Sequence, residues 1–125
     1  MEFLFTHEVD NANKLLICEA KGHASSALDV EHMLKLIVKL AGKAQVRNVV
    51  LDVIELTIGY SSIQIAELMI TMQHESWLSD IKIARIIDGK DNAQNLVGEM
   101  AEKYNLPIKN FEHRSDALIW LLFNK

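Results

Sequence analysis

The stretch at residues 48–62, NVVLDVIELTIGYSS, constrains the fold more than any other part of this 125-residue chain. Val49, Val50 and Leu51 are three consecutive apolar residues, so a strand built from them is apolar on both faces. Such a strand has to be covered on both sides, which places it in the middle of a sheet. A short hydrophobic loop follows, and Ser61 then opens a helical pattern near the carboxyl end of that strand. Open α/β sheets place ligands and partners at this edge.

Length, charge and cysteine content limit the classes of protein to which the chain can belong. We expect one domain, residues 1–125, which is large enough to bury about two thirds of its unfolded surface. The formal net charge is −4 and the basic residues are scattered, Arg85 among them, which argues against nucleic-acid binding. The single Cys18 excludes an internal disulfide and is typical of a reducing compartment. No apolar run is long enough for a membrane span, and the N-terminus lacks the bases of a signal peptide. We therefore expect a cytoplasmic protein.

The first part of the chain predicts a hairpin followed by a helix. Residues 3–9 form a weak strand pattern and residues 14–20 a stronger apolar one. The polar turn at residues 10–13 consists of Asp, Asn and Ala, and its polar side chains can bond their own backbone. Two strands with such a turn indicate an antiparallel hairpin. Ser26 then caps a helix with one apolar stripe, for which Gly42 is the expected C′ residue, just past the helix end.

The second part predicts two further strands and two further helices. Residues 81–87 are β-branched and end at an Asp-Gly turn, and Asp91 or Asn92 caps a third helix that Asn105 and Pro107 stop. Residues 108–112 form a last, polar strand at a sheet edge, and Ser115 caps a short final helix. The order is β-β-α-β-α-β-α-β-α. This predicts an α/β fold with one mixed sheet, an N-terminal antiparallel hairpin and helices packed on the sheet.

The helical pattern at residues 60–77 is more apolar than one sheet face requires. Ser61 and Gln64 have the spacing of a capping box. The polar residues of this helix fall on an arc of only about 100°, whereas a helix on one sheet needs an apolar stripe only somewhat wider than that. The apolar surface beyond this stripe has to contact a neighbouring helix, an internal pocket or another protein. The candidate interaction surface consists of Ile63, Met69, Ile70, Met72 and Trp77.

The element order and the central stretch together resemble the STAS family, the sulphate transporter and anti-sigma-factor antagonist domains. In that family a V-V-L-D strand and a hydrophobic loop precede Asp-Ser-Ser-Gly, which opens a helix and carries a serine that a partner kinase phosphorylates. Residues 49–52 match the strand, and Ser61 and Ser62 match the serine pair. The resemblance therefore implies a regulatory, protein-binding domain with Ser62 as the phospho-acceptor. Tyr60 replaces the aspartate of the motif and Ile63 replaces its glycine.

The C-terminal segment adds a second, narrower resemblance. Residues 111–121, FEHRSDALIWL, look like the end of a STAS subgroup that is related in shape to CRAL-TRIO lipid-binding domains. Members of this subgroup mostly lack a known function, so the alternative of a small apolar ligand comes from the excess apolar surface of residues 60–77.

The remaining polar residues have structural interpretations. Asp52 ends the central strand, where it can accept backbone N–H groups of the next loop, and Ser61 can act as a helix cap. Residues 88–91 precede a helix and could bind an anion, but they lack the glycines of a phosphate-binding loop and predict a turn. The five histidines show no metal-ligand spacing, and the neighbours of Cys18 predict its burial. We expect no enzyme activity, no metal and no cofactor.

Three hypotheses remain for the function. The first is a protein-interaction module that docks through the helix at residues 60–77 and its flanking loops. The second is a protein that binds a small apolar, lipid-like ligand in a closed pocket beneath that helix. The third is a homodimer formed through the same helix.

Overall fold

A six-stranded sheet forms the centre of the computed structural model, which describes residues 2–123. Five of its strands lie in the order β1-β2-β3-β5-β6, and β4 pairs with the end of β2. The strands are β1 (Leu4–Asp10), β2 (Leu15–Ala24), β3 (Asn48–Asp52), β4 (Leu56–Ile58), β5 (Lys82–Ile86) and β6 (Ile108–Phe111). The helices are α1 (Ala27–Ala44), α2 (Ser62–His74), α3 (Asn92–Lys103) and α4 (Arg114–Leu122). The predicted α/β order is confirmed, with β4 as an additional strand.

The strand β3 occupies the centre of the sheet, as its three apolar residues predict. It lies between β2 and β5 and runs parallel to both. Val49 and Leu51 join the apolar core on one face of the sheet, whereas Val50 joins a smaller core on the other face. Successive side chains of a strand point to opposite faces, so a strand that is buried on both faces has to be apolar throughout.

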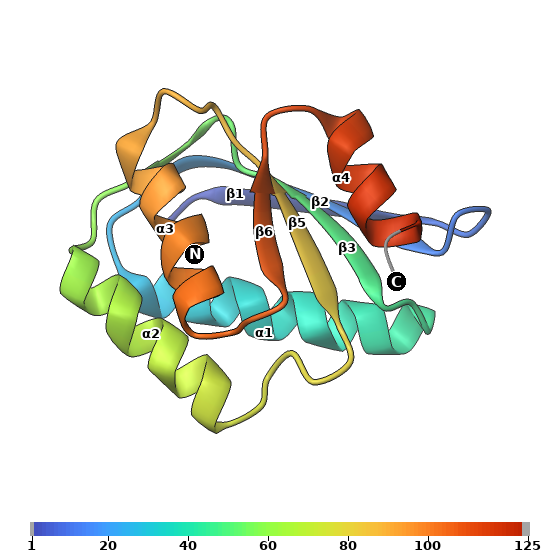
Figure 1. Cartoon of the computed structure of the whole chain (residues 1–125), viewed down its shortest axis with the longest axis horizontal. Helices are drawn as coiled ribbons and strands as arrows, with labels where there is room; N and C mark the ends of the chain where they lie inside the picture. The colour runs from blue at the N-terminus through green and yellow to red at the C-terminus, as the bar shows by residue number, and fades with distance from the viewer. Residues whose placement is uncertain (1, 124–125) are drawn as a thin grey trace.

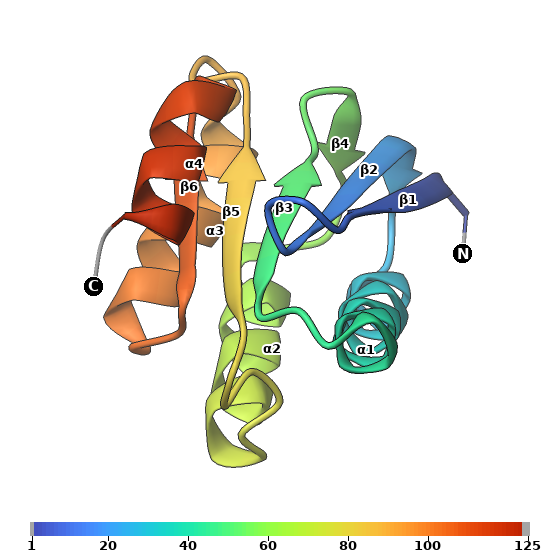
Figure 2. The ribbon, with the colours of Figure 1, turned by 90° about the vertical axis from the view of Figure 1, so that its right-hand side faces the viewer.

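The helices cover the two faces of the sheet unequally (Figures 1 and 2). Buried residues of α1, α2 and α3 pack in the larger core, and Ala117 and Leu121 of α4 pack in the smaller one. Over residues 2–123 no helix combines the length and the apolar character needed to cross a membrane.

The N-terminal hairpin forms as predicted, but its second strand is longer. The carboxylate of Asp10 accepts hydrogen bonds from the backbone N–H and the side-chain amide of Asn13, at 3.1 and 3.0 Å. The strand β2 continues past the predicted end at residue 20, because Gly22, His23 and Ala24 pair with β4. The residues of β4 were expected to form a loop, so this strand is a correction to the sequence analysis.

The predicted end of α1 at Gly42 is wrong. The helix continues to Ala44, which packs against the larger core, and Gln45 follows in the left-handed conformation with a φ of 56°. The apolar contact of Ala44 keeps the chain helical past the glycine. At the end of α3, by contrast, Asn105 adopts the left-handed conformation with a φ of 56°, so the predicted stop is confirmed.

The predicted cap of α4 is also wrong. Ser115 lies inside the first turn, because α4 begins at Arg114. Only Glu112 and His113 separate β6 from α4, so the helix starts before the chain reaches the serine. His113 occupies the N-cap position and forms no side-chain capping bond.

The apolar excess of α2 is covered within the molecule by two neighbouring helices. The helix packs against α1 and against α3. Its buried residues are Ile65, Leu68, Met69 and Met72. Contacts on two sides need a wider apolar arc than contact with one sheet face. Most of the apolar excess of α2 is therefore explained by neighbouring helices.

The buried thiol of Cys18 gives the fold a measurable pH dependence. Cys18 is 1 % exposed, and burial raises the pKa of its thiol from 9.0 to about 12 because a thiolate there would lose its hydration. Above about pH 9 the unfolded chain releases this proton, whereas the folded protein retains it. The contribution to stability is therefore complete below about pH 9 and is lost between about pH 9 and 12.

We expect the wild type to lose stability relative to a Cys18→Ala variant as the pH rises above about 9. The difference in free energy of unfolding should change by about 1.4 kcal/mol for each pH unit in this window. Urea unfolding of both proteins between about pH 8 and 10.5 measures this difference, and the other titrating groups cancel because both proteins share them. A difference that stays constant over the range would contradict the prediction.

Candidate functional site

The carboxyl edge of the sheet brings together several helix N-termini. The strands β2, β3, β5 and β6 are parallel, so their carboxyl ends lie at the same edge. Ser26, Ser61 and Asp91 are the N-caps of α1, α2 and α3, and each follows a strand that ends at this edge. Partners and ligands of open α/β sheets bind at such an edge. The candidate site is therefore the start of α2 and its surroundings.

The N-terminus of α2 is closed by a complete capping box. The hydroxyl of Ser61 accepts a hydrogen bond from the backbone N–H of Gln64 at 3.2 Å. The side-chain carbonyl of Gln64 accepts one in return from the backbone N–H of Ser61 at 2.9 Å. Two N–H groups that the helix leaves without partners are thereby satisfied. The capping role predicted for Ser61 is confirmed.

Ser62 is the first residue of α2 and is exposed. Within residues 2–123 its hydroxyl has no hydrogen-bond partner, because Ser61 performs the capping. An anionic group on this hydroxyl would lie at the positive end of the helix dipole, where negative charge is favoured. The position is therefore compatible with a phosphoserine.

Tyr60, which stands at the aspartate position of the STAS motif, is half-buried and packs against the larger core. Its phenol lines an internal cavity together with Arg85. Burial raises the pKa of the phenol, and the positive charge of Arg85 opposes this rise. Tyr60 therefore supports the start of α2 from inside the molecule.

The structure corrects two members of the candidate interaction surface. Met69 is 3 % exposed and Met72 is fully buried, because α1 and α3 enclose that side of α2. Neither methionine can contact another protein in the folded monomer. Trp77 is half-buried beneath the ammonium of Lys35, which lies 4.9 Å from its ring centroid.

The remaining two members are accessible. Ile63 is 69 % exposed and Ile70 is 48 % exposed. They are seven residues apart, so they lie on one face of the helix. We call Ser62, Ile63 and Ile70 the α2 surface. An open groove of about 260 Å³ between α1 and α2 lies beside it, and the exposed Leu28 contributes to the groove wall.

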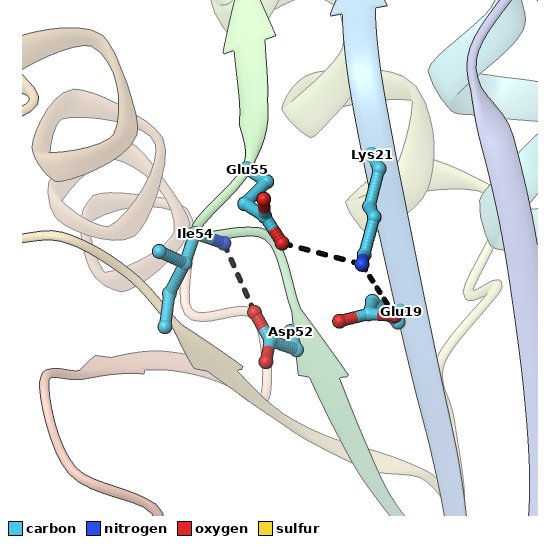
Figure 3. A network of polar contacts seen from close by, with 5 residues as sticks. All are labelled: Glu19, Lys21, Asp52, Ile54 and Glu55. Atoms are coloured by element: carbon cyan, nitrogen blue, oxygen red, sulfur yellow. Dashed lines mark hydrogen bonds and ion pairs between the residues drawn. The ribbon is translucent and has the colours of Figure 1, made fainter.

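Asp52 has the structural role that was predicted for it. Its carboxylate accepts a hydrogen bond from the backbone N–H of Ile54 at 3.0 Å, which fixes the turn after β3 (Figure 3). Nearby, the ammonium of Lys21 lies 3.3 Å from the carboxylate of Glu55 and 3.6 Å from that of Glu19. These two carboxylates, Glu55 first, raise the pKa of Lys21. All three charged groups are well exposed, so water screens their interactions.

The loop at residues 88–91 is a turn, as predicted. The carboxylate of Asp88 accepts from the backbone N–H of Lys90 at 3.0 Å. Asp91 caps α3 through the backbone N–H groups of Ala93 and Gln94, at 3.0 and 3.2 Å. An anion at this loop would need these same backbone N–H groups, but the two carboxylates already accept their hydrogen bonds. Across residues 2–123 no group of three or more His, Cys, Asp or Glu side chains is arranged to hold a metal ion.

A buried arginine is the main feature that the sequence analysis missed. Arg85 of β5 is only 6 % exposed, although it was counted among the scattered basic residues. Its Nη1 donates to the backbone carbonyl of Gln94 at 3.2 Å and to Oδ1 of Asn110 at 2.6 Å, and its Nη2 donates to the side-chain carbonyl of Gln94. Burial lowers the pKa of Arg85 to about 10, which leaves the side chain charged at neutral pH. The available signal was the charge in the otherwise apolar segment IARII.

Gln94 extends this network to the β3–β4 connection. Its Nε2 donates to the backbone carbonyl of Leu56 at 2.8 Å. The side chain is 1 % exposed, so its hydrogen bonds are made away from water. α3 is thereby tied to β5 and to the segment that leads into α2.

The internal cavity next to Arg85 and Tyr60 is small. It measures about 40 Å³ and is lined mainly by apolar side chains of the sheet and of α1, α2 and α3. Sites for drug-sized or lipid-like ligands usually have about 300 Å³ or more. A cavity of this size has room for little more than ordered water.

The two adjacent serines at the start of α2 provide a matched test of the capping role. We expect Ser61→Ala to lower the free energy of unfolding by about 1 kcal/mol, because it removes one half of the capping box. Ser62→Ala should change it by less than about 0.5 kcal/mol, because its hydroxyl is exposed. Chemical denaturation of both variants compares them, and equal losses would show that the cap contributes nothing.

A second test concerns the buried guanidinium. We expect Gln94→Leu to cost about 2–4 kcal/mol, because it removes an acceptor of Arg85 and the donor to Leu56. Asn92→Leu, at an exposed position in the same helix, is the control and should change stability by less than about 0.5 kcal/mol. Thermal and urea unfolding measure both. A loss below about 1 kcal/mol for Gln94→Leu would contradict the role of this network.

Comparison with known proteins places this geometry in a known fold. No protein-family model matches the sequence, and no curated protein matches it either. Among solved structures, an anti-sigma factor antagonist from Mycobacterium paratuberculosis is similar, with a TM-score of 0.57 and 11% sequence identity over 94% of each chain. An uncharacterised protein of the DUF3478 family from Shewanella loihica PV-4, described as having a SpoIIAA-like fold, has a TM-score of 0.58 and 20% identity, over 95% of this chain and 94% of that one.

Both similarities extend over nearly the whole chain, and at these levels of identity they concern the fold. They agree with the resemblance that residues 48–62 indicated. The chain therefore has the SpoIIAA-like, STAS-like fold.

Proposed function

We propose that this chain is a non-catalytic regulatory module that binds a protein partner through the α2 surface. The observation that carries the proposal is the exposure of Ile63 in the first turn of α2, directly after Ser62. An apolar side chain that is 69 % exposed gains free energy when a partner removes it from water. The similarity in fold to an anti-sigma factor antagonist supports a partner that is a protein.

Ser62 is proposed as the regulated position of this surface. A phosphate on its hydroxyl would be favoured by the dipole of α2 by roughly 0.3–1 kcal/mol, so modification would leave the domain folded. It would instead place two negative charges next to the apolar Ile63. Phosphorylation is therefore expected to act by changing which partner can dock, in the cytoplasm, where such partners and kinases operate.

The lipid-binding alternative has less support. The internal cavity of about 40 Å³ would have to expand several-fold to hold an acyl chain. Homodimerisation through the α2 surface is the competing protein-level outcome, and the experiment below distinguishes it from a separate partner.

The first step of the test is site-specific crosslinking. A photo-reactive amino acid replaces Ile63 in one version of the protein and the exposed Lys39 of α1 in another. In cells that express the protein naturally, we expect a defined crosslinked protein from position 63 and none of it from position 39. A product with twice the mass of the chain would identify a homodimer.

The second step measures affinity for the captured partner. Ile63→Asp should weaken binding by about tenfold or more, because it places a charge in the apolar contact. Ser62→Asp should change the affinity while leaving the melting temperature nearly unaltered. Glu75→Gln, an exposed change after the C-terminus of α2, is the control and should have no effect. Unaltered binding by both Ser62→Asp and Ile63→Asp would refute the proposal.

A further inference from the structure

The free edge of β6 exposes backbone groups that can pair with another strand. Within the described residues, β6 is the last strand of the sheet and pairs only with β5. The carbonyls of Pro107 and Phe111 accept from the backbone N–H groups of Ile83 and Ile87, both at 2.9 Å, so the alternate residues Ile108 and Asn110 direct their backbone groups away from β5. The N–H of Ile108 donates to the carbonyl of Leu106 at 2.8 Å. Within residues 2–123 the backbone N–H and C=O of Asn110 have no hydrogen-bond partner. Such an edge is a template for an added strand.

This edge lies in a groove between two helices. In Figure 1, β6 runs between α3 and α4. The groove has a volume of about 570 Å³. One wall is the face of α3 that carries Asn95, Gly98, Glu99 and Glu102, and the opposite wall includes Trp120 of α4. We call it the β6 groove. Its volume is within the usual range for binding sites.

A glycine allows α3 to lie close to the strand. A Cβ atom at position 98 would collide with the side-chain amide of Asn110. That amide is fixed in place, because its Nδ2 donates to the backbone carbonyl of Gln94 at 2.9 Å and its Oδ1 accepts from Arg85 at 2.6 Å. The floor of the groove is therefore rigid, and the outward backbone groups of Asn110 are held in strand geometry.

The wall formed by α3 is negatively charged. Glu99 and Glu102 are both exposed, and among residues 2–123 neither side-chain carboxylate has an ion-pair or hydrogen-bond partner. The opposite wall differs in character, since the half-buried ring of Trp120 packs with Phe111 at 5.7 Å between ring centroids. The ammonium of Lys82 lies 4.2 Å from the Trp120 ring and that of Lys109 5.7 Å from the Phe111 ring, so this wall disfavours a further cation. The two walls thus favour different side chains, basic ones toward α3 and apolar ones toward α4.

We propose that the β6 groove binds an extended segment of a partner protein as an additional strand next to β6. Side chains of a strand alternate between its two sides. A segment in which basic residues alternate with apolar ones places the basic residues against Glu99 and Glu102 and the apolar ones against Trp120. The backbone of Asn110 supplies the strand hydrogen bonds, as in other cases of strand addition.

A second copy of this chain fits the groove less well. Its own exposed edge strand, β1, has the sequence LFTHEVD and contributes two acids and no Lys or Arg. Pairing of two β6 strands would place two acidic α3 walls close together. The charges therefore point to a different, basic chain. This proposal does not depend on the α2 surface, which lies on another helix, so the two can fail separately.

The test uses a blocked hexapeptide of alternating lysine and valine, titrated into the isotopically labelled protein and followed by NMR. We expect saturable shifts of the Asn110 and Gly98 amide signals. At a free peptide concentration of about nine times the dissociation constant, exchange of the Asn110 amide proton should slow by about tenfold. Purely electrostatic binding to α3 would move the Gly98 signal and leave Asn110 exchange unchanged, which would overturn the proposal.

Matched variants test the charged wall. Glu99→Gln combined with Glu102→Gln should weaken peptide binding between about twofold and thirtyfold, as expected for the loss of two exposed ion pairs. Both positions are exposed, so the thermal stability should stay within the range of the wild type. Glu75→Gln, which removes an exposed acid at the C-cap of α2 that does not line the groove, is the control and should bind the peptide like the wild type.

Three results would overturn the proposal. The first is equal binding of a hexapeptide of alternating glutamate and valine. The second is unchanged affinity of the Glu99, Glu102 double variant. The third is a dimer in analytical ultracentrifugation whose Asn110 amide is already protected from exchange without peptide, which would assign the β6 edge to a second copy.

Discussion

The buried guanidinium of Arg85 is the interaction on which the arrangement of this fold depends. A guanidinium has five N–H donors and no acceptor, so a buried one has to be surrounded by oxygen atoms. In this protein the oxygens come from Gln94 of α3 and Asn110 of β6. Among residues 2–123 no carboxylate forms an ion pair with Arg85, so its hydrogen bonds all go to neutral groups, and Asp91 favours its charge only from a longer distance. The position of α3 over β5 and β6 follows from this requirement. Gln94 also reaches Leu56, which connects the same network to the segment before α2.

The same network determines the shape of both candidate surfaces. α3 can lie close to β6 because position 98 is a glycine, and the amide of Asn110 occupies the space that a side chain would need. α2 then packs between α1 and α3, which leaves only one face of it exposed. The α2 surface and the β6 groove are therefore consequences of where α3 lies. Hydrogen bonds to a buried charge are directional and cost several kcal/mol to break, so this position is defined more narrowly than apolar packing alone would define it.

The sequence predicted the features that depend on local pattern. Three consecutive apolar residues placed β3 in the centre of the sheet, and the spacing of Ser61 and Gln64 predicted the capping box. Features that depend on distant partners were missed. β4 is three residues long and pairs with an extension of β2, which no local period indicates. Met69 and Met72 were placed on the surface because periodicity gives the width of an apolar arc and does not say which helices cover it. Arg85 was missed because a charge is normally a sign of exposure.

The weak sequence similarity to proteins of the same fold has a physical explanation. A STAS-like sheet needs apolar residues at alternating and consecutive positions, and many residue types of suitable volume meet that need. Binding specificity instead depends on a few exposed side chains, which can change without affecting the fold. Tyr60 stands where the STAS motif that this stretch resembles has aspartate, and here it forms a core contact beside Arg85. Ile63, one turn along, stands where that motif has glycine, and its apolar side chain is 69 % exposed. The start of α2 therefore combines an exposed serine, the positive end of a helix dipole and an exposed apolar side chain.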